Sequence, residues 1–240
     1  MSFPHEDADV ETSSDDYARR FAGAVGAYFL AVQASITLDL LRPFPGASVL
    51  DVGGGHGQLA GPLADAGHAV TVLGSREVCR ERVRGLVEAG RVSFRAGDLL
   101  QAPWPERAFD VVISFRLLPH VARWPDLTTE LARLARRAVI VDYPTTRSVN
   151  AAAGALFPLK KGVEGDTRPY TVFRDAEVAA AFSAAGFAVT ARRPQFLLPM
   201  ALHRATRTAS LSRALEGAFR MSGLTRGLGS PVILRLERRG

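Results

Sequence analysis

The chain has 240 residues, 47% of them hydrophobic, and a formal net charge of +6. This length suits one large domain or two small ones, and the composition is ordinary for a globular protein with a substantial core. The lone cysteine, Cys79, excludes an internal disulfide. We find no basic and apolar leader, and no apolar run near the roughly 18–20 residues that cross a bilayer, so we expect a cytoplasmic protein.

Charge is distributed unevenly along the chain. The first sixteen residues contain acids but no lysine or arginine, whereas the stretch from Arg192 to the end has ten arginines against Glu216 and Glu237. This C-terminal region predicts a solvated basic surface or, alternatively, a patch for an anionic substrate or for peripheral contact with an anionic membrane. No basic module interleaved with aromatic residues is apparent, so we expect no nucleic-acid partner.

The N-terminal part of the chain predicts a leader followed by helices. Residues 1–14 are acidic and poor in large apolar side chains, which is typical of a flexible leader. Ser13 or Ser14 is placed to cap a helix that begins near Tyr17. We expect residues 15–42 to form helices that cover part of the domain.

The organising feature of the chain is the sequence VLDVGGGHGQL over residues 49–59. A short apolar run contains Asp51, breaks into glycines, and resumes with helical spacing at Leu59 and Leu63. This pattern is typical of a buried strand, a tight turn and a helix. Because the glycines lack Cβ atoms and the helix start has unpaired N–H groups, we expect the turn to bind the polar part of a nucleotide-like cofactor.

Short apolar strands alternate with helices over the rest of the chain. This alternation predicts an α/β fold around a mainly parallel sheet, in a single domain spanning 1–240. We expect further strands over 69–73, 92–95, 109–114, 138–142, 187–191 and 231–236, and helices over 59–66, 75–89, 126–135, 175–185 and 200–224.

Five motifs in order, VLDVGGGHGQ, VTVLGS, FRAGDLL, FDVVISFRLLPHV and AVIVDYP, together resemble the class I S-adenosylmethionine-dependent methyltransferases of small-molecule type. The resemblance covers roughly residues 47–192, which it implies are the cofactor-binding core. It implies a Rossmann-like, seven-stranded, mainly parallel sheet with helices on both faces and an antiparallel last strand, here 230–238. It also implies S-adenosyl-L-methionine as cofactor and residues 194–226 as a helical insert on the substrate side.

The resemblance implies a set of cofactor-binding residues. Asp51 and the glycines of the turn line the methionine end, Asp98 hydrogen-bonds the adenine amino group, and Leu99 packs against the adenine ring. Backbone carbonyls after the fourth strand reach the methionine moiety. Because the carboxyl ends of parallel strands meet at one edge of a sheet, these residues are expected to lie together. The implied set is Asp51, Gly53, Gly55, Gly57, Gly74, Ser75, Asp98, Leu99, Ser114 and Phe115.

One position departs from the family pattern. The family normally has Asp or Glu at the end of the second strand, where it binds both ribose hydroxyls, but this chain has Gly74 followed by Ser75. Without that acid, we expect Ser75 or the start of the following helix to bind the ribose. Two alternatives therefore stay open. The first is a non-catalytic, methyltransferase-like partner protein, and the second is an NADP-binding oxidoreductase, since Gly55–Ala60 fits G-x-G-x-x-A and Arg76 is placed for a 2′-phosphate.

Methyl transfer from a sulfonium is an in-line displacement, so the protein must mainly orient the nucleophile and exclude water. A general base is needed only where the attacking group must lose a proton. The candidates near the expected pocket are His120, Asp142 and Tyr143. No Cys/His cluster has metal-ligand spacing, so we expect no metal site.

The substrate side is expected to come from residues 10–42, 143–172 and 194–226. Their aromatic and apolar content predicts a small, largely apolar acceptor, or alternatively a core beneath a lid. The acceptor atom (O, N or C) and the oligomeric state stay open at this level. The side chains concerned are Phe21, Tyr28, Phe29, Phe157, Tyr170, Phe173, Phe196 and Met200.

Overall fold

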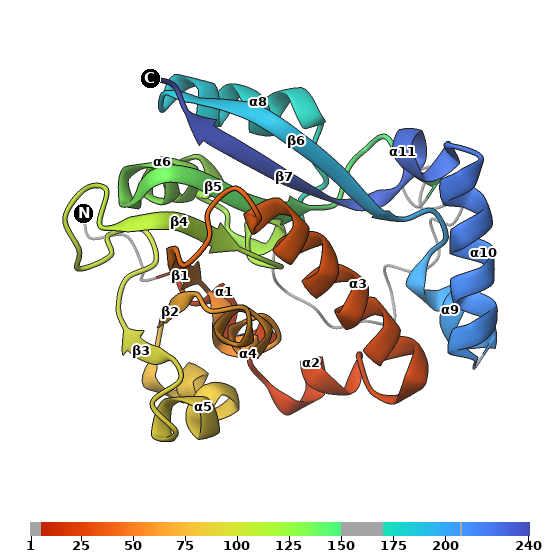
Figure 1. The fold of residues 1–240 in the computed structure, drawn as a ribbon, viewed down its shortest axis with the longest axis horizontal. Helices are drawn as coiled ribbons and strands as arrows, with labels where there is room; N and C mark the ends of the chain where they lie inside the picture. The colour runs from red at the N-terminus through yellow and green to blue at the C-terminus, as the bar shows by residue number, and fades with distance from the viewer. Residues whose placement is uncertain (1–5, 150–169, 207) are drawn as a thin grey trace.

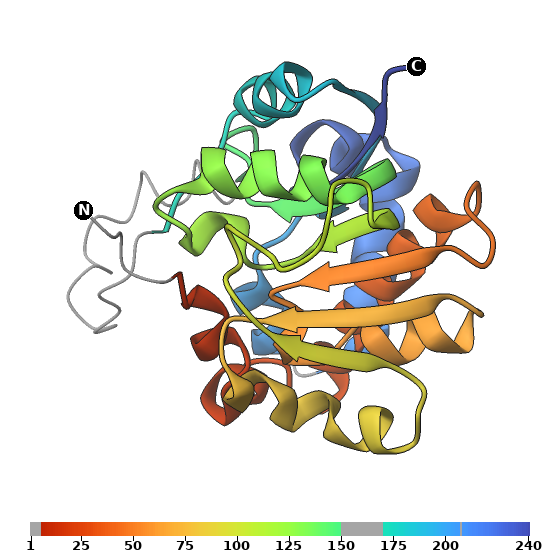
Figure 2. The same cartoon turned by 90° about the vertical axis from the view of Figure 1, so that its left-hand side faces the viewer.

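The computed structural model describes residues 6–149, 170–206 and 208–240, and its backbone forms one sheet with helices on both faces (Figures 1 and 2). The strand order is β3-β2-β1-β4-β5-β7-β6. Neighbouring strands from β3 to β5 pair in parallel, and β7 is antiparallel to both β5 and β6, which confirms the predicted sheet. The strands are β1 (Ser48–Val52), β2 (Ala69–Gly74), β3 (Ser93–Ala96), β4 (Phe109–Ser114), β5 (Ala135–Tyr143), β6 (Phe187–Phe196) and β7 (Ser230–Arg238).

The helices follow the predicted order, with two differences in detail. The expected helix over 75–89 is a 3₁₀ segment followed by a short α-helix, and the expected helix over 200–224 is divided into three. Gly223, with φ of 77°, separates the last two. The helices are α1 (Ala8–Thr12), α2 (Asp15–Arg19), α3 (Gly23–Leu41), α4 (Ala60–Asp65), α5 (Arg84–Glu88), α6 (Trp124–Leu134), α8 (Asp175–Ala184), α9 (Met200–Thr206), α10 (Ala209–Met221) and α11 (Leu224–Leu228), with 3₁₀ segments η1 (Gly54–His56), η2 (Glu77–Val83) and η3 (Leu118–His120).

The central strands are apolar on both faces because both faces are covered. Leu50 and Val112 belong to a core cluster that includes residues of α6 and α8. The neighbouring residues Val49 and Val111 point the other way, into a cluster with α3 and α4. Burial on both sides explains why these strands are continuous apolar runs without polar alternation. Because helices cover both faces of the sheet, the edge formed by the carboxyl ends of its strands is the place where a site can form.

The acidic N-terminal segment differs from the expected flexible leader. Residues 8–12 form α1, in which Ala8, Asp9 and Thr12 are buried. Figure 2 shows this helix, in dark red, beside the arrowheads of the central strands. The cap prediction is confirmed for the next helix, since the Ser14 hydroxyl accepts a hydrogen bond from the Tyr17 amide at 3.2 Å. Residues 6–14 are ordered because α1 packs on the carboxyl edge of the sheet.

Helix α3 corrects the expectation that no apolar run approaches the length of a bilayer span. Its 19 residues, with a mean hydropathy of 1.5, satisfy that test by length and composition. In the fold, however, Leu40 and Leu41 pack against the sheet, and Phe29 packs against Phe196 with ring centroids 4.0 Å apart. Gln33 is also buried on this helix. These contacts are those of a helix packed against the core of the fold.

A buried acid fixes the C-terminal helices. Glu216 on α10 is fully buried and accepts hydrogen bonds from the amides of Leu197 and Leu198, just after β6. It also bonds Nε2 of His203 on α9 at 3.0 Å. Buried carboxylates require such partners. This contact holds α9 and α10 beside the end of β6, next to the cavity described below.

Candidate active site

The turn after β1 depends on its glycines. Gly53 and Gly57 have φ of 74° and 72°, in the left-handed region that favours glycine. At Gly54, an added Cβ would lie 2.2 Å from Cγ of Asp51, so the carboxyl group lies directly against the turn. At Gly55, an added Cβ would lie 2.4 Å from Oγ of Ser13. The turn is therefore closely packed on both sides.

Asp51 is the most unusual group at this turn. It is fully buried, and neither carboxyl oxygen has a hydrogen-bond partner among the described residues. Burial raises its pKa from 3.8 to about 7. A buried carboxyl group without a partner is costly, so Asp51 is suited to a ligand that brings a cation or hydrogen-bond donors.

His56 lies in the same turn, and sequence reasoning assigned it no role. Its Nδ1 accepts a hydrogen bond from the Gln58 amide at 3.2 Å. Burial, and then the positive charge of Arg116, lower its pKa to about 3. His56 is therefore neutral at physiological pH. Its position between two turn glycines was the only signal in the sequence.

The end of β2 has no space for a side chain at Gly74. An added Cβ would lie 2.7 Å from Cβ of Cys79 and 3.0 Å from Cζ of Phe94. The next residue, Ser75, donates its amide hydrogen to Oδ2 of Asp9 at 2.8 Å. Residues of the N-terminal segment thus contact the strand end where the family normally has an acid.

The remaining predicted cofactor residues lie at the ends of β3 and β4. Oδ1 of Asp98 accepts a hydrogen bond from the Leu100 amide at 2.8 Å, and Leu99 is fully buried. The Ser114 hydroxyl donates to the carbonyl of Val52 at 3.0 Å, which joins the ends of β4 and β1. Phe115 follows and is fully buried. The fold therefore gathers the predicted residues at one edge, while their contacts with a cofactor stay a prediction.

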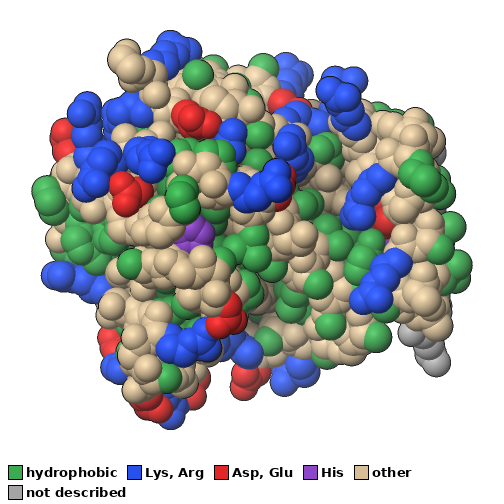
Figure 3. All heavy atoms as spheres, in the orientation of Figure 1, with side chains coloured by type: hydrophobic (Ala, Val, Ile, Leu, Met, Phe, Trp, Pro, Cys, Tyr) green, Lys and Arg blue, Asp and Glu red, His purple; other side chains and the backbone are tan. Residues whose placement is uncertain are grey.

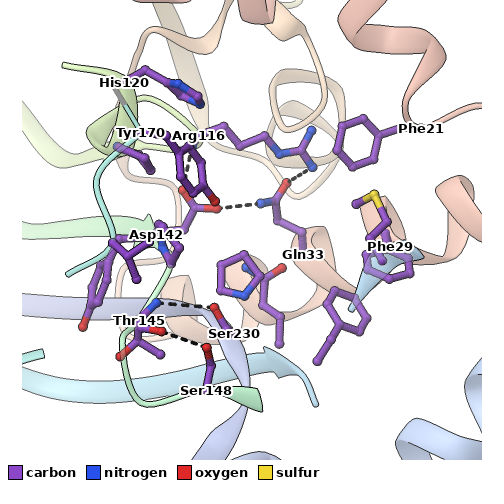
Figure 4. Close-up of a pocket in the computed structure, with 18 of the residues that line it drawn as sticks. Phe21, Phe29, Gln33, Arg116, His120, Asp142, Thr145, Ser148, Tyr170 and Ser230 are labelled. Carbon is purple, nitrogen blue, oxygen red and sulfur yellow. Dashed lines mark hydrogen bonds between the residues drawn. The ribbon is translucent and has the colours of Figure 1, made fainter. Parts of the chain in front are cut away.

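A cavity of about 350 Å³ lies beyond the carboxyl ends of β4 and β5 (Figure 4). Its wall is formed by α2, α3, η3, the segment after β5, the end of β6 and the start of α9. Most of that wall is aromatic or apolar, which agrees with the expected acceptor. The lining includes Tyr17, Phe21, Phe29, Tyr170, Phe196 and Met200, with the polar groups Gln33, Arg116, His120, Asp142, Thr145, Ser148, Gln195 and Ser230. Phe157 lies outside the described residues, and Tyr28 and Phe173 lie outside this lining.

Three polar side chains form a network at one end of the cavity. The Arg116 amide donates to Oδ1 of Asp142 at 2.6 Å, and Nε2 of Gln33 donates to Oδ2 at 3.2 Å. Nη2 of Arg116 donates to Oε1 of Gln33 at 2.9 Å, as Figure 4 shows. The guanidinium lies over the Phe21 ring, 4.0 Å from its centroid. Arg116 has φ of 58°, which is uncommon outside glycine and is maintained by these contacts.

Burial shifts the titration of this network. It raises the pKa of Asp142 from 3.8 to about 6, against the opposing effects of the Arg116 amide and charge and of Gln33. Burial lowers the pKa of Arg116, which remains charged. Asp142 thus titrates close to neutrality, as a general base requires.

The other two candidate bases are placed differently. The half-buried ring of His120 lines the cavity and lies 5.5 Å from the Tyr170 ring. The Tyr143 hydroxyl donates to Oδ1 of Asp175 on α8 at 3.1 Å, and burial raises its pKa. Catalytic roles for His120 and Tyr143 stay predictions.

Comparison with known proteins supports the sequence motifs. A family model described as a methyltransferase domain matches residues 49–138. The ubiquinone biosynthesis O-methyltransferase of Paramagnetospirillum magneticum is 37% identical over 124 residues, covering 49% of this chain and 48% of that protein. Residues 49–138 therefore match a methyltransferase domain, in agreement with the resemblance of the motifs to the class I S-adenosylmethionine-dependent methyltransferases. S-adenosyl-L-methionine is the cofactor of this family, as the motifs predict.

Two further similarities agree with this match. The nocamycin O-methyltransferase of Saccharothrix syringae is 38% identical over 127 residues, covering 49% of this chain and 44% of that protein. The chain thus spans about half the length of the curated relatives it matches. The magnesium protoporphyrin IX methyltransferase of Synechocystis with bound S-adenosylhomocysteine has the same fold, with a TM-score of 0.65, 18% identity and 94% coverage of both chains.

The match to a methyltransferase domain favours S-adenosylmethionine over the NADP-binding alternative. Arg76, the residue that this alternative required for a 2′-phosphate, donates instead to Oδ2 of Asp7 at 3.3 Å. Among the residues that the structure describes, no group of three or more His, Cys, Asp or Glu side chains is placed to hold a metal ion.

Proposed function

We propose that this protein transfers the methyl group of S-adenosyl-L-methionine to an oxygen atom of a small, largely apolar, aromatic acceptor. The observation that carries the proposal is the continuity of the two sites. Phe115 belongs to the predicted cofactor edge, and the next residue, Arg116, lines the aromatic cavity. Oxygen is favoured as the acceptor atom because two relatives are named as O-methyltransferases.

The cofactor-binding part of the proposal assigns Asp51 and the turn of Gly53, Gly55 and Gly57 to the methionine end. The unpaired, buried carboxyl group of Asp51 fits a ligand with positive charge, and the turn presents backbone amides. Asp98 and Leu99 are assigned to the adenine. When bound, the cofactor supplies a methyl group attached to a positively charged sulfur. That sulfur is already a good leaving group.

The chain's own contribution to chemistry is assigned to Asp142. Its carboxylate accepts the proton of the acceptor hydroxyl as the oxygen–carbon bond forms and the carbon–sulfur bond breaks. Nη1 of Arg116 is buried and makes no hydrogen bond by distance and angle within the described residues, although the Tyr17 hydroxyl lies near. This donor is placed to orient the acceptor oxygen or a neighbouring carboxylate, since a guanidinium binds such groups well.

A non-catalytic partner protein is the second candidate. One observation favours it: α1 contacts the β1 turn at the predicted cofactor edge, and its Ala8 packs in the same core cluster as Leu99. Under this alternative α1 never moves and no cofactor enters. Methyl transfer by the purified protein would exclude it.

Location and partners form a finer part of the proposal. We retain a cytoplasmic protein with peripheral contact to anionic membranes through α10 and α11. Leu211, Leu224 and Leu228 are 46%, 46% and 40% exposed, and Met221 is 86% exposed. Arg226 is exposed beside them. The arginines do not form one concentrated patch in this view, because Figure 3 shows Arg side chains spread over much of this face.

The test is a transfer assay with methyl-labelled S-adenosylmethionine and a panel of phenols, catechols and aromatic carboxylic acids. We expect labelled methyl ether or ester from at least one aromatic class, and its loss in Asp142→Asn. Asp126→Asn, an exposed acid on α6, is the matched control and should retain activity. The proposal is contradicted if no panel member is methylated and S-adenosylhomocysteine does not bind.

Sedimentation with phosphatidylglycerol vesicles, compared with phosphatidylcholine vesicles, tests the proposed contact with anionic membranes.

A further inference from the structure

The packing at the end of β2 determines where a ribose-binding acid can come from. A side chain at Gly74 would overlap Cys79 and Phe94, as the distances of 2.7 and 3.0 Å from an added Cβ show. Cys79 is fully buried, and its neighbours leave it little room to move. The acid that the family normally has on this strand is therefore excluded by the packing itself, and replacing Gly74 by Asp would strain the fold.

An acid from another part of the chain lies at the same strand end. Asp9, on α1, is fully buried, and its Oδ2 accepts the amide hydrogen of Ser75 at 2.8 Å. Its second oxygen, Oδ1, is buried and makes no hydrogen bond by distance and angle within the described residues, and the Cys79 thiol lies near this carboxyl group. Asp9 is 66 residues away from Ser75 in sequence. Folding of the acidic segment thus places this carboxyl oxygen next to Gly74.

The placement of Asp9 is fixed by α1 as a whole. Ala8 belongs to the same core cluster as Leu99 and Leu117. At the C-terminal end of the helix, Oγ of Ser13 lies against Gly55 of the β1 turn and donates to the Asp9 carbonyl at 2.7 Å. Helix α1 therefore lies between the end of β2 and the glycine turn, where both halves of a nucleoside-containing cofactor are expected.

We propose that Asp9 supplies the carboxylate that binds the cofactor's ribose hydroxyls, in place of the missing acid on β2. The assignment rests on the proposed function, because it presupposes that S-adenosylmethionine binds at this edge. The Ser75 amide fixes one carboxyl oxygen and leaves the other for a hydroxyl donor. Hydrogen bonds to a charged acceptor are roughly twice as strong as neutral ones, so this contact selects for a ribose over a deoxyribose.

One consequence concerns the order of events. Helix α1 contacts the β1 turn, and its Ala8 packs in the same core cluster as Leu99. The cofactor must therefore enter while α1 is displaced, and α1 then closes on it through Asp9. Binding should slow amide hydrogen exchange in residues 8–13, because a closed helix opens less often.

Asp9→Asn provides the sharpest test. The asparagine carbonyl still accepts the Ser75 amide hydrogen, so α1 stays anchored, but the second oxygen becomes an NH₂ group that cannot accept from a hydroxyl. Glu11→Gln, which removes one negative charge from the same helix, is the matched control. The probes are S-adenosylhomocysteine and its analogue that lacks both ribose hydroxyls, titrated by calorimetry.

We expect Asp9→Asn to weaken binding of S-adenosylhomocysteine by about 10- to 100-fold. Binding of the dideoxy analogue should change by less than about threefold, and Glu11→Gln should bind both probes like the unmodified protein. Equal loss for both probes, or no loss for either, would show that Asp9 only anchors α1 and would overturn the assignment while leaving the proposed function intact. Absence of binding to the unmodified protein would overturn both.

Discussion

Nε2 of Gln33 on α3 donates to Oδ2 of Asp142 at the end of β5, at 3.2 Å, although the two residues are 109 positions apart. The same amide accepts a hydrogen bond from Arg116 at 2.9 Å through its Oε1. One side chain therefore orients both a candidate base and a candidate acceptor-binding cation. The geometry of the cavity depends on this buried link between the N-terminal helices and the sheet.

Replacing Gln33 with leucine should impair both stability and catalysis. The change removes one buried hydrogen bond from Arg116 and one from Asp142, which we expect to cost about 1–3 kcal/mol in the free energy of unfolding. Since both groups are also displaced, kcat/KM should fall by more than the cofactor affinity. Urea unfolding and steady-state kinetics measure these effects. Ser35→Leu, a change on the same helix away from the cavity, is a control; equal activity losses in both variants would contradict a specific role for Gln33.

Asp142→Asn should abolish the base while preserving the hydrogen bond from the Arg116 amide. In the unmodified protein, kcat/KM for a hydroxyl acceptor should rise with pH as Asp142 ionises, with a midpoint near its pKa of about 6. The variant should lose about 100-fold or more in kcat and should show no such rise. A pH–rate profile over pH 5–9 provides the measurement. An unchanged profile in Asp142→Asn would transfer the role to His120.

The raised pKa of Asp51 predicts that the ligand-free protein loses stability as pH increases. The folded state keeps this carboxyl protonated up to about pH 7, whereas the unfolded chain ionises near its ordinary value of 3.8. Between those values the folded state binds more protons, so the free energy of unfolding falls, by roughly 2–4 kcal/mol. Asp142 contributes in the same direction between 3.8 and about 6.

Urea denaturation at several pH values, with Asp51→Asn for comparison, tests this linkage. The variant should match the unmodified protein near pH 4 and exceed its stability at pH 8, because asparagine does not ionise. Parallel stability curves for the two proteins would contradict the assignment of the shift to Asp51. S-adenosylhomocysteine, if it brings a cation to the carboxylate, should bind more tightly to the unmodified protein as pH rises through 7.

Tyr143→Phe distinguishes a structural from a catalytic tyrosine. The hydroxyl contacts Asp175, which also bonds Nε of Arg192 at 2.8 Å. We expect a loss of about 1 kcal/mol in the free energy of unfolding and less than about threefold change in kcat. Thermal denaturation and initial rates measure the two quantities. A loss of kcat by 100-fold with unchanged stability would make Tyr143 the base.

Much of the fold could be predicted because local patterns determine it. The apolar strands, the glycines with positive φ and the order of elements all follow from short-range sequence. The glycine turn and the ends of β3 and β4 were predicted from the same patterns. Asp51 was identified from its motif alone, but its unpaired, buried state could be seen only in the fold.

The remaining features depend on contacts between distant segments. Gln33 meets Arg116 over 83 residues, and Asp9 meets Ser75 over 66 residues. No periodicity or spacing signals such contacts. The acidic N-terminal segment appears unstructured by composition, yet burial of Ala8 and the Asp9–Ser75 hydrogen bond make it part of the edge. The sequence shows only that Gly74 stands where an acid is expected. The packing of Cys79 and Phe94 around it explains why a larger residue does not fit there.

The most direct test of the account is a crystal structure of the protein with S-adenosylhomocysteine. We predict the amino acid end of the ligand at the turn of Gly53–Gly57, near Asp51, and the sulfur beside Phe115, facing the cavity of Arg116 and Asp142. A structure in which α1 still covers the turn and no ligand occupies it, at saturating S-adenosylhomocysteine, would contradict the account.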